Sequence, residues 1–246
     1  MKKNIVAIVQ ARRSSIRLPQ KVLKDIAGKP MLAHVIERLK KSQLIDEILM
    51  ATAKDNNMSI LELAQKYGVK CFVGIEEDVL GRYYNAAREF KVDIIVRITS
   101  DCPLIDPEVV DKVIKRYIEN KEKIDYISNT LKRSYPRGLD AEVFSFRVLE
   151  KTWKEAKRPY QREHVTPYIY EHPEIFRMAN VENNEDLSSM RWTVDEEKDL
   201  EFVREIYKRL YKRGKIFLME DILRLLKREP KLMEINKNGK QKNLTE

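Results

Sequence analysis

Consecutive apolar residues alternate along the first half of the chain with stretches whose apolar residues lie three or four positions apart. The consecutive runs at 5–9, 47–53, 70–73 and 93–99 predict short strands, the first of them buried on both faces. The spaced stretches between them predict helices, one of which begins at Pro30. Strands and helices that alternate in this order favour a parallel sheet with right-handed crossovers, and therefore an α/β fold.

The second half of the chain shows shorter strands and the same helical spacing. Its pattern predicts strands at 124–128, 141–146, 175–181 and 190–193, and helices that start at Pro107, Val148 and Gln161 or cover 200–211 and 222–226. With 246 residues, 43% of them apolar, the chain can bury one full core, so we expect a single domain over residues 1–230. Residues 231–246 are polar and rich in Lys and Asn, which predicts a frayed tail.

Composition excludes several functional classes. The formal net charge is +9, but the cations lie among Glu residues along helices, which is typical of a solvated surface rather than a nucleic-acid site. We find no run of about 18 apolar residues and no signal peptide, so we expect a cytoplasmic protein with no membrane partner. Cys71 and Cys102 form no CxxC pair, and neither GxGxxG nor a Walker loop is present, which disfavours zinc, dinucleotide and P-loop chemistry.

Four cations follow the first strand within a short loop: Arg12, Arg13, Arg17 and Lys21. The carboxyl end of a strand is where open α/β sheets bind ligands. Guanidinium groups bind phosphate oxygens through two hydrogen bonds, and lysine adds a point charge, so this loop favours a polyphosphate over a single carboxylate. The alternative is a solvated basic loop with no ligand.

Two aspartates lie directly after predicted strands. Asp101 follows the strand at 93–99, and Asp195 follows the strand at 190–193. Carboxylates at this edge of a sheet suit Mg²⁺, which binds one or two of them together with phosphates and water. Each also has a purely structural alternative, since Asp101 could cap the next turn and Asp195 could be the N-cap of the next helix.

The segment A-R-R-S-S-I-R-L-P-Q-K at 11–21, followed by G-K-P at 28–30, resembles a known signature. The signature, A-R-x-x-S-x-R-L-P-x-K…G-K-P, belongs to the cytidylyltransferases that activate acidic sugars, above all to their spore-coat polysaccharide branch. Further matches keep the family's order at 78–84, 100–105, 136–142, 162–169 and 192–203. The resemblance implies a Rossmann-like nucleotide-diphospho-sugar transferase fold, a three-layer sandwich with a mostly parallel sheet and a small acceptor and dimer region at about 130–180.

The resemblance also implies roles for individual residues. Phosphate contacts fall on Arg12, Arg17 and Lys21, with Ser15 in the same loop, and nucleotide contacts on Arg82 and Thr99. Thr99 departs from a glutamine that some relatives place against cytosine. The metal ligands would be Asp101 and Asp195, and the acceptor would meet Arg137, Asp140, Arg162 and His164. A structural role suits His164 equally, and the alternatives for Asp140 are strand-end hydrogen bonding and simple exposure.

The implied activity is a Mg²⁺-dependent transfer of CMP from CTP to an acidic sugar or related acceptor, with release of pyrophosphate, in surface polysaccharide biosynthesis. Arg12, Lys21 and Asp101 would carry the catalysis, and a homodimer is expected from the family. The alternatives are a sugar-1-phosphate nucleotidyltransferase that uses UTP or GTP, a basic nucleic-acid-binding module, and an inactive sugar-nucleotide binder.

Overall fold

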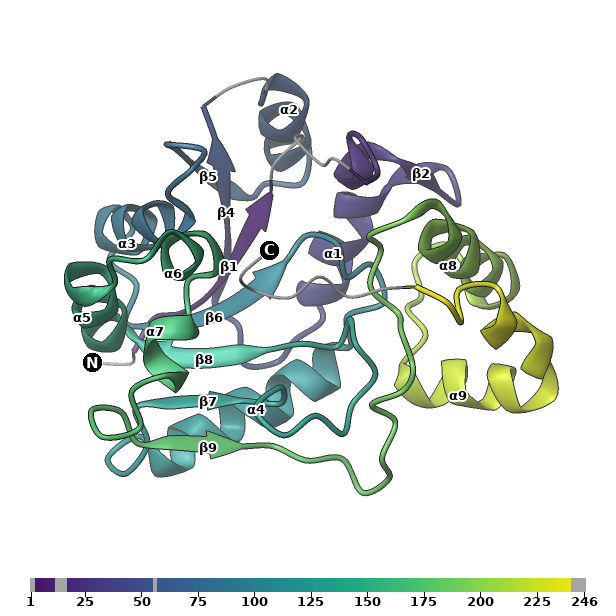
Figure 1. Cartoon of the computed structure of the whole chain (residues 1–246). Helices are drawn as coiled ribbons and strands as arrows, with labels where there is room; N and C mark the ends of the chain where they lie inside the picture. Colours follow the sequence, from purple (N-terminus) through teal and green to yellow (C-terminus); the bar gives the residue numbers. More distant parts are fainter. Residues whose placement is uncertain (1–2, 12–16, 55–56, 240–246) are drawn as a thin grey trace.

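A central sheet of seven strands organises the computed structural model, which describes residues 3–11, 17–54 and 57–239 (Figure 1). The strand order is β5-β4-β1-β6-β8-β7-β9. The strands are β1 (Ile5–Ala11), β4 (Glu47–Ala53), β5 (Lys70–Gly74), β6 (Ile94–Thr99), β7 (Tyr126–Ser128), β8 (Glu142–Ser145) and β9 (Met178–Asn180). A separate two-stranded ladder joins β2 (Asp25–Ile26) to β3 (Lys29–Pro30).

The sheet is mostly parallel. β1 pairs in parallel with β4 on one side and with β6 on the other, and β4 pairs in parallel with β5. Only β8 is reversed among these seven strands, because it runs antiparallel to both β6 and β7. The predicted α/β fold with a mostly parallel sheet is confirmed.

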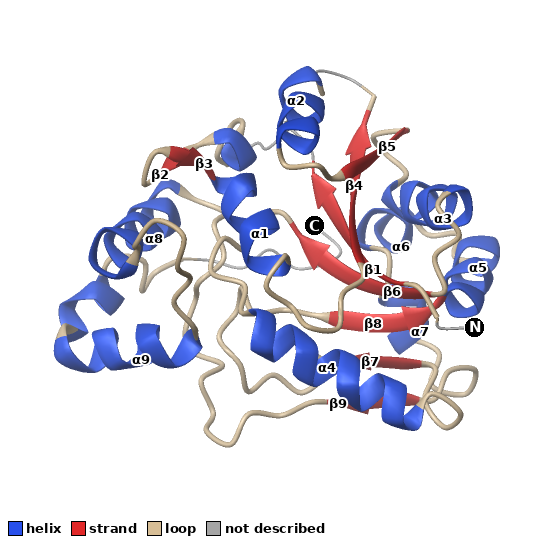
Figure 2. Ribbon diagram, turned by 180° about the vertical axis from the view of Figure 1, so that it is seen from behind, coloured by secondary structure: helices blue, strands red, loops and turns tan. Residues whose placement is uncertain are grey.

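Helices cover both faces of the sheet. α1 and α4 lie on one face, and α3 and α5 lie on the other (Figure 2). α8 and α9 pack beside each other at one end of the molecule, next to the ladder of β2 and β3 (Figure 1). The helices are α1 (Met31–Leu39), α2 (Met58–Lys66), α3 (Val79–Glu89), α4 (Pro107–Asn120), α5 (Phe146–Glu155), α6 (Pro159–His164), α7 (Pro167–Tyr170), α8 (Glu197–Leu210) and α9 (Met219–Arg228), with 3-10 turns η1 (Lys21–Leu23) and η2 (Pro230–Glu234).

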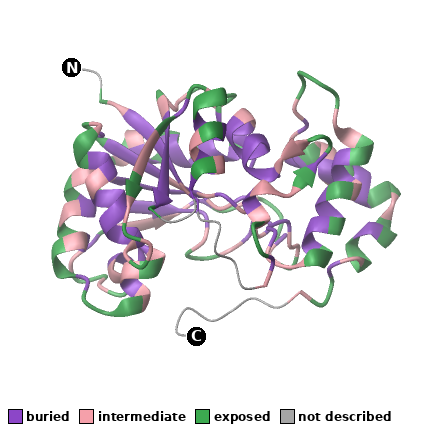
Figure 3. Cartoon of the chain, turned by 90° about the horizontal axis from the view of Figure 1, so that it is seen from above, coloured by how far each residue is buried: buried purple, intermediate pink, exposed green. Residues whose placement is uncertain are grey.

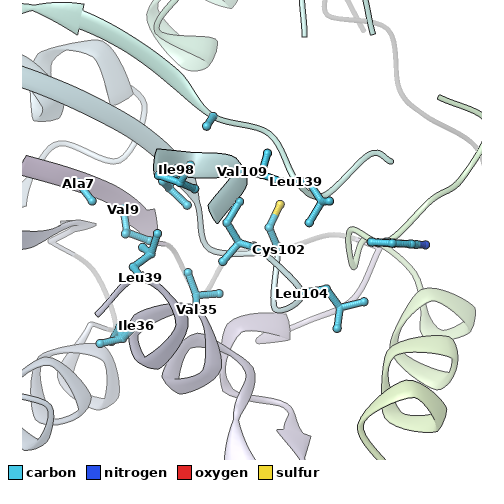
Figure 4. Close-up of a cluster of buried hydrophobic side chains, with 14 of the residues drawn as sticks. Ala7, Val9, Val35, Ile36, Leu39, Ile98, Cys102, Leu104, Val109 and Leu139 are labelled. Carbon is cyan, nitrogen blue, oxygen red and sulfur yellow. The ribbon is translucent and has the colours of Figure 1, made fainter. Parts of the chain in front are cut away.

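Two hydrophobic cores lie on the two faces of the sheet, since successive side chains of a strand point to opposite faces. Ala7 and Val9 of β1 pack toward α1, where they meet Val35 and Ile36 (Figure 4). The alternate residues of β1 join the second core, which includes Tyr83 of α3. Buried residues therefore fill the centre of the sheet and the inner faces of the helices, while exposed residues lie on the outer surfaces of the helices (Figure 3).

Two predictions from local pattern are wrong. Residues 190–193 form no strand but an isolated bridge, in which Arg191 pairs with Arg137 and the backbone N–H groups of Trp192 and Thr193 both donate to the Arg137 carbonyl. The apolar residues at this position are buried by packing rather than by a sheet ladder. Gly138, with φ of +112°, permits the close approach, since a Cβ there would lie 2.6 Å from the backbone nitrogen of Thr193.

The second difference concerns the predicted tail from residue 231 onward. Its first part folds back onto the domain: η2 spans Pro230–Glu234, and Leu232 and Asn236 are buried. The prediction rested on the average composition of the segment, which is dominated by exposed lysines and glutamates and does not reveal two single buried residues. Residues 240–246 lie outside the described part of the chain.

Candidate active site

The site forms at the point where the strand order changes direction. From β1 the chain passes through α1 to β4 on one side, whereas β6 lies on the other side of β1. The carboxyl ends of β1 and β6 therefore border the crevice in which open α/β sheets bind ligands. The segment after β1 carries Lys21 at the start of η1, and the segment after β6 carries Asp101.

The Lys21 ammonium group joins the two aspartates. Its Nζ donates to Asp101 Oδ2 at 2.8 Å and to Asp195 Oδ1 at 2.9 Å. A third hydrogen bond, of 3.0 Å, runs to the carbonyl oxygen of Val194. The structure thus brings together three of the residues that the sequence placed in a phosphate and metal site.

Electrostatics keeps the Lys21 and Asp101 groups ionised. Burial opposes the charge of Asp101, but the attraction and hydrogen bond of Lys21 outweigh it and lower the pKa of this carboxyl group to about 2. Burial likewise opposes the charge of Lys21, and the two carboxylates outweigh it and raise the pKa of the ammonium group. At neutral pH the site therefore holds a charged lysine and an ionised Asp101.

Backbone hydrogen bonds fix the two aspartate segments to each other. The Val194 N–H donates to the carbonyl oxygen of Asp101 at 2.8 Å, and the Thr193 hydroxyl donates to the same oxygen at 3.2 Å. Asp101 and Asp195 are 94 positions apart in sequence, yet these contacts hold their backbones side by side. The pair of carboxylates is therefore built into the fold.

A second layer of charges orients Asp195. Arg191 donates to Asp195 Oδ2 at 2.8 Å and to Asp199 Oδ1 at 2.9 Å. Asp199 is almost fully buried, and it also accepts from the backbone N–H groups of Asp195 and Glu196 at the start of α8. Asn236 completes the layer, because its amide donates to Asp199 Oδ1 at 3.1 Å and to the Arg191 carbonyl at 2.9 Å.

Arg17 approaches the same carboxylate from the cation-rich loop. Its guanidinium lies 3.2 Å from Asp195 Oδ1 and 3.3 Å from Glu196 Oε1. Arg17 and Lys21 thus place two positive charges beside Asp195. Arg12 and Ser15, the other predicted phosphate contacts, lie outside the described residues.

Two of the predicted acceptor residues, Asp140 and Arg137, lie shortly before β8 and differ in whether they form an ion pair. Asp140 accepts two hydrogen bonds from the Arg133 guanidinium, at 2.6 and 2.8 Å, so its carboxylate is already neutralised. Arg137 is half-buried, and among the described residues no carboxylate lies within ion-pair distance of it. Burial and the neighbouring Arg133 lower the pKa of Arg137, because both oppose a further positive charge.

Three other residues predicted to contact nucleotide or acceptor lie away from the Lys21 cluster, and two of them bind other parts of the chain. Arg82 is buried and donates to the carbonyl oxygens of Ile75 and Glu76, so it ties down the loop before α3. Arg162 pairs with Asp78 at 2.5 Å, and His164 lies half-buried at the end of α6. None of these contacts joins Arg82, Arg162 or His164 to the Lys21 cluster.

Thr99 ends β6 on the sheet face that also carries Gln10 and Arg97. Its hydroxyl lies 3.3 Å from Cys102 Sγ. Arg97 donates to Glu142 Oε2 of β8 at 2.9 Å and to the Gln10 side chain at 3.3 Å. Sequence reasoning overlooked this pair, although an arginine in the middle of an apolar strand was a usable signal.

The residues present fit a divalent cation that is shared with a phosphate ligand. Among the described residues there is no group of three His, Cys, Asp or Glu side chains that could hold a metal alone. Asp101 and Asp195 instead supply two carboxylates on one side, and Mg²⁺ commonly fills its other positions with phosphate oxygens and water. The donor chemistry therefore suits a metal that arrives with a nucleotide.

Comparison with known proteins decides the family. The sequence model of a family described as cytidylyltransferase matches residues 6–235. The chain belongs to the cytidylyltransferase family. It is therefore a nucleotidyltransferase that uses CTP, as the resemblance in the sequence implied.

Relatives support this cytidylyltransferase assignment along nearly the whole chain. The chain is 31% identical to the spore coat polysaccharide biosynthesis protein SpsF of Bacillus subtilis, over 92% of this chain and 95% of SpsF. A solved cytidylyltransferase from Leptospira borgpetersenii aligns with a TM-score of 0.91 and 31% identity, over 98% of this chain and 100% of that one. A CMP:2-keto-3-deoxy-manno-octonic acid synthetase solved with CTP shares the fold at a TM-score of 0.66 and 21% identity, over 85% and 99%.

The described helices of this cytidylyltransferase include none that is both long enough and apolar enough to cross a membrane.

Sequence reasoning also missed two residues of the site, Arg191 and Asn236. Arg191 fell in a segment predicted to be a strand, and Asn236 in the predicted tail. Only the folded chain places them beside Asp195 and Asp199.

The low pKa of Asp101 predicts a defined loss of stability in acid. Because the pKa of Asp101 is lowered from 3.8 to about 2, its ionised form stabilises the fold above pH 4, and this contribution is lost as the pH falls toward 2. The difference in unfolding free energy between the wild type and Asp101→Asn should shrink by about 2 kcal/mol between pH 5 and pH 2. Urea unfolding without divalent cations measures it, and a difference that stays constant would contradict the prediction.

Asn236 predicts a long-range effect on the site. In Asn236→Ala, Asp199 and the Arg191 carbonyl each lose a hydrogen bond, so Asp195 should be held less accurately. We expect activity with CTP to fall about tenfold, because Asn236 helps to hold Asp199 and Arg191, which in turn hold Asp195. Asn238→Ala is the matched control, because Asn238 is exposed two positions away. Equal kinetics in the two variants, with only thermal stability changed, would show that Asn236 has no role beyond packing.

Proposed function

We propose that this cytidylyltransferase transfers CMP from CTP to an acidic sugar, with release of pyrophosphate and with Mg²⁺ as the metal. The observation that carries the proposal is the position of Lys21, which is hydrogen-bonded to both Asp101 and Asp195 at the switch point of the sheet. A cation-rich loop opposite two carboxylates matches the needs of a metal-bound triphosphate.

Asp101 and Asp195 would hold the metal, whose chemistry is to neutralise phosphate oxygens and polarise the reacting phosphoryl group. The chain's own part begins with Arg191 and Asp199, which keep the Asp195 carboxylate in place. Backbone hydrogen bonds keep the Asp101 segment beside it. The site is thus organised before the substrate arrives, which lowers the cost of reaching the transition state.

Lys21 and Arg17 supply the positive charge for phosphate. In the proposed step an acceptor oxygen attacks the α-phosphorus of CTP, the new oxygen–phosphorus bond forms, and the bond to the bridging oxygen of the pyrophosphate breaks. Negative charge grows on that leaving group, and the two cations beside Asp195 would stabilise it. The step needs no nucleophile from the protein.

Arg137 is the residue we assign to the acceptor. It is half-buried, it lies in the segment that bridges to Arg191, and its charge is not paired with a carboxylate within the described chain. A sugar carboxylate would satisfy it through two parallel hydrogen bonds. Asp140 would act indirectly, because it holds Arg133 and so shapes the surroundings of Arg137.

Membership of the family supports a proposal about the cellular setting. The relationship to SpsF supports a role in surface polysaccharide biosynthesis. A nucleotide-sugar synthetase of this kind would work in the cytoplasm, where CTP is made available, and we propose a homodimer as its working form. Arg82, Arg162 and His164 are left without a proposed contact to substrate.

A nucleotide screen tests the proposed reaction. With Mg²⁺ and a panel of acidic sugars, we expect pyrophosphate release with CTP and less than a hundredth of that rate with UTP or GTP. Asp101→Asn and Asp195→Asn should each lower kcat by roughly two orders of magnitude or more, because each removes a charge that the transition state requires. Asp186→Asn, at an exposed position, is the control. Turnover with UTP or GTP on a sugar 1-phosphate would replace the proposal with the other nucleotidyltransferase reaction.

Arg137 gives a separate test of the acceptor. Arg137→Ala should raise KM for the acidic acceptor about tenfold or more and leave KM for CTP nearly unchanged, since a charge-assisted pair is worth about 1.5–3 kcal/mol. Arg137→Lys should raise KM for the acceptor less than Arg137→Ala does, because lysine keeps the positive charge but cannot donate two parallel hydrogen bonds. Steady-state kinetics with each substrate varied in turn measures both constants. An equal rise in the two KM values would place Arg137 outside the acceptor subsite.

A further inference from the structure

A cavity of about 270 Å³ lies apart from the catalytic cluster. It opens between α1, the end of α8 and the segment 211–217. None of Lys21, Asp101, Asp195 and Arg17 lines it. Its lining residues are Lys29, His34, Glu37, Arg38, Lys40, Lys41, Tyr207, Tyr211, Gly214, Lys215, Ile216 and Phe217.

Arg38 is the most unusual residue of this cavity. Its side chain is buried, with Nε donating to the Ile105 carbonyl at 2.5 Å and one terminal nitrogen donating to the Phe217 carbonyl at 2.7 Å. Within the described chain no carboxylate lies within ion-pair distance of this guanidinium, and the adjacent Glu37 pairs with Lys29 at 2.6 Å instead. A buried charge without a counter-ion is costly, and an anion in the cavity would supply one.

The rim of the cavity strengthens the case for an anion. Five of the lining side chains are cationic and one is a carboxylate; the cations are Lys29, Arg38, Lys40, Lys41 and Lys215. Lys41 and Lys215 are exposed, so they meet an incoming ligand first. An excess of positive charge in a partly enclosed space attracts a phosphate more strongly than a singly charged group.

The walls are aromatic. The His34 and Tyr207 rings lie 4.4 Å apart, and the Tyr207 and Phe217 rings lie 5.1 Å apart. Tyr211 lines the same space and is partly exposed, whereas His34, Tyr207 and Phe217 are buried. Aromatic surfaces bind planar rings, so the partly exposed Tyr211 ring is the surface of this cavity that a base would meet.

We propose that this cavity is a second ligand site that binds a nucleoside monophosphate. The phosphate would pair with the lysines of the rim above the buried charge of Arg38, and the base would lie against the Tyr211 ring. The cavity is near the lower end of the range for small-molecule sites, which suits one nucleotide rather than a dinucleotide.

The ligand would lie over two buried residues, Arg38 and Tyr207, that support the catalytic loop. Arg38 donates to the carbonyl of Ile105, and the Tyr207 hydroxyl donates to the carbonyl of Pro103 at 2.7 Å. Both carbonyls belong to the loop between β6 and α4, which also carries Asp101. The two sites are therefore separate in their residues but share one loop.

Methyl NMR at Ile216 gives a local test, because this side chain lines the cavity. AMP, CMP and inorganic phosphate would be titrated separately into protein with labelled isoleucine methyl groups, with Ile216→Val to assign the signal. We expect a saturable shift with AMP or CMP and binding about tenfold weaker for phosphate, because stacking of a base contributes about 1–3 kcal/mol. No saturable shift with either nucleotide would overturn the proposal.

Charge reversal on the rim tells this cavity from the catalytic site. The double variant Lys41→Glu/Lys215→Glu should weaken nucleotide binding at least tenfold, because it replaces attraction by repulsion at the entrance. The control Lys115→Glu/Lys121→Glu changes the net charge equally at two exposed positions of α4 and just beyond it, and should bind as the wild type does. If both double variants bind equally, the shift at Ile216 originates elsewhere and the proposal is wrong. Equal affinity for phosphate and nucleotide would show that the base makes no favourable aromatic contact, and would overturn that part of the proposal.

Discussion

One ammonium group between two carboxylates is the constraint on which the active site depends. Asp101 and Asp195 would repel each other if they were left alone at the rim of a sheet, and Lys21 removes that repulsion through a hydrogen bond to each. The same arrangement keeps Asp101 ionised far into the acid range. Without substrate, Lys21 balances the negative charge of the two carboxylates. With substrate, a metal and its phosphate ligand would bring positive and negative charge together, so the site would stay balanced.

The fold produces this arrangement by placing chain segments from distant parts of the sequence side by side. β1 and β6 are adjacent strands, so the loops that follow them meet at one edge. The segment before α8 reaches the same edge through the hydrogen bond from Val194 to Asp101 and is anchored from behind by Arg191, Asp199 and Asn236. Arg191 and Asp199 hold Asp195, and Asn236 holds both of them. Asp195, which precedes a helix, is therefore positioned as firmly as Asp101, which follows a strand.

Some arginines of this chain pair with carboxylates, and others have no carboxylate partner among the described residues. Arg97 is paired with Glu142 across two strands, and Arg191 is paired with two aspartates, so both serve structure. Arg137 and Arg38 differ, since among the described residues neither has a carboxylate within ion-pair distance although each is at least half-buried. One faces the proposed acceptor side and the other a separate aromatic cavity, and burial is what makes an anion favourable at both.

The sequence by itself determined the elements and the chemical character of the loops. Residues 47–53 are a strand from end to end as predicted, and Pro107 begins α4, because hydrophobic spacing and proline geometry act over a few residues. The motifs likewise predicted that Lys21, Asp101 and Asp195 share a site. Only the tertiary structure decided the partners: that residues 190–193 form a bridge rather than a strand, that Asn236 returns to the site, and that Arg38 is buried beside a cavity. The reason is physical, since local preferences depend on near neighbours in sequence, whereas a hydrogen bond or a charge depends on which distant residues the packed chain brings within reach.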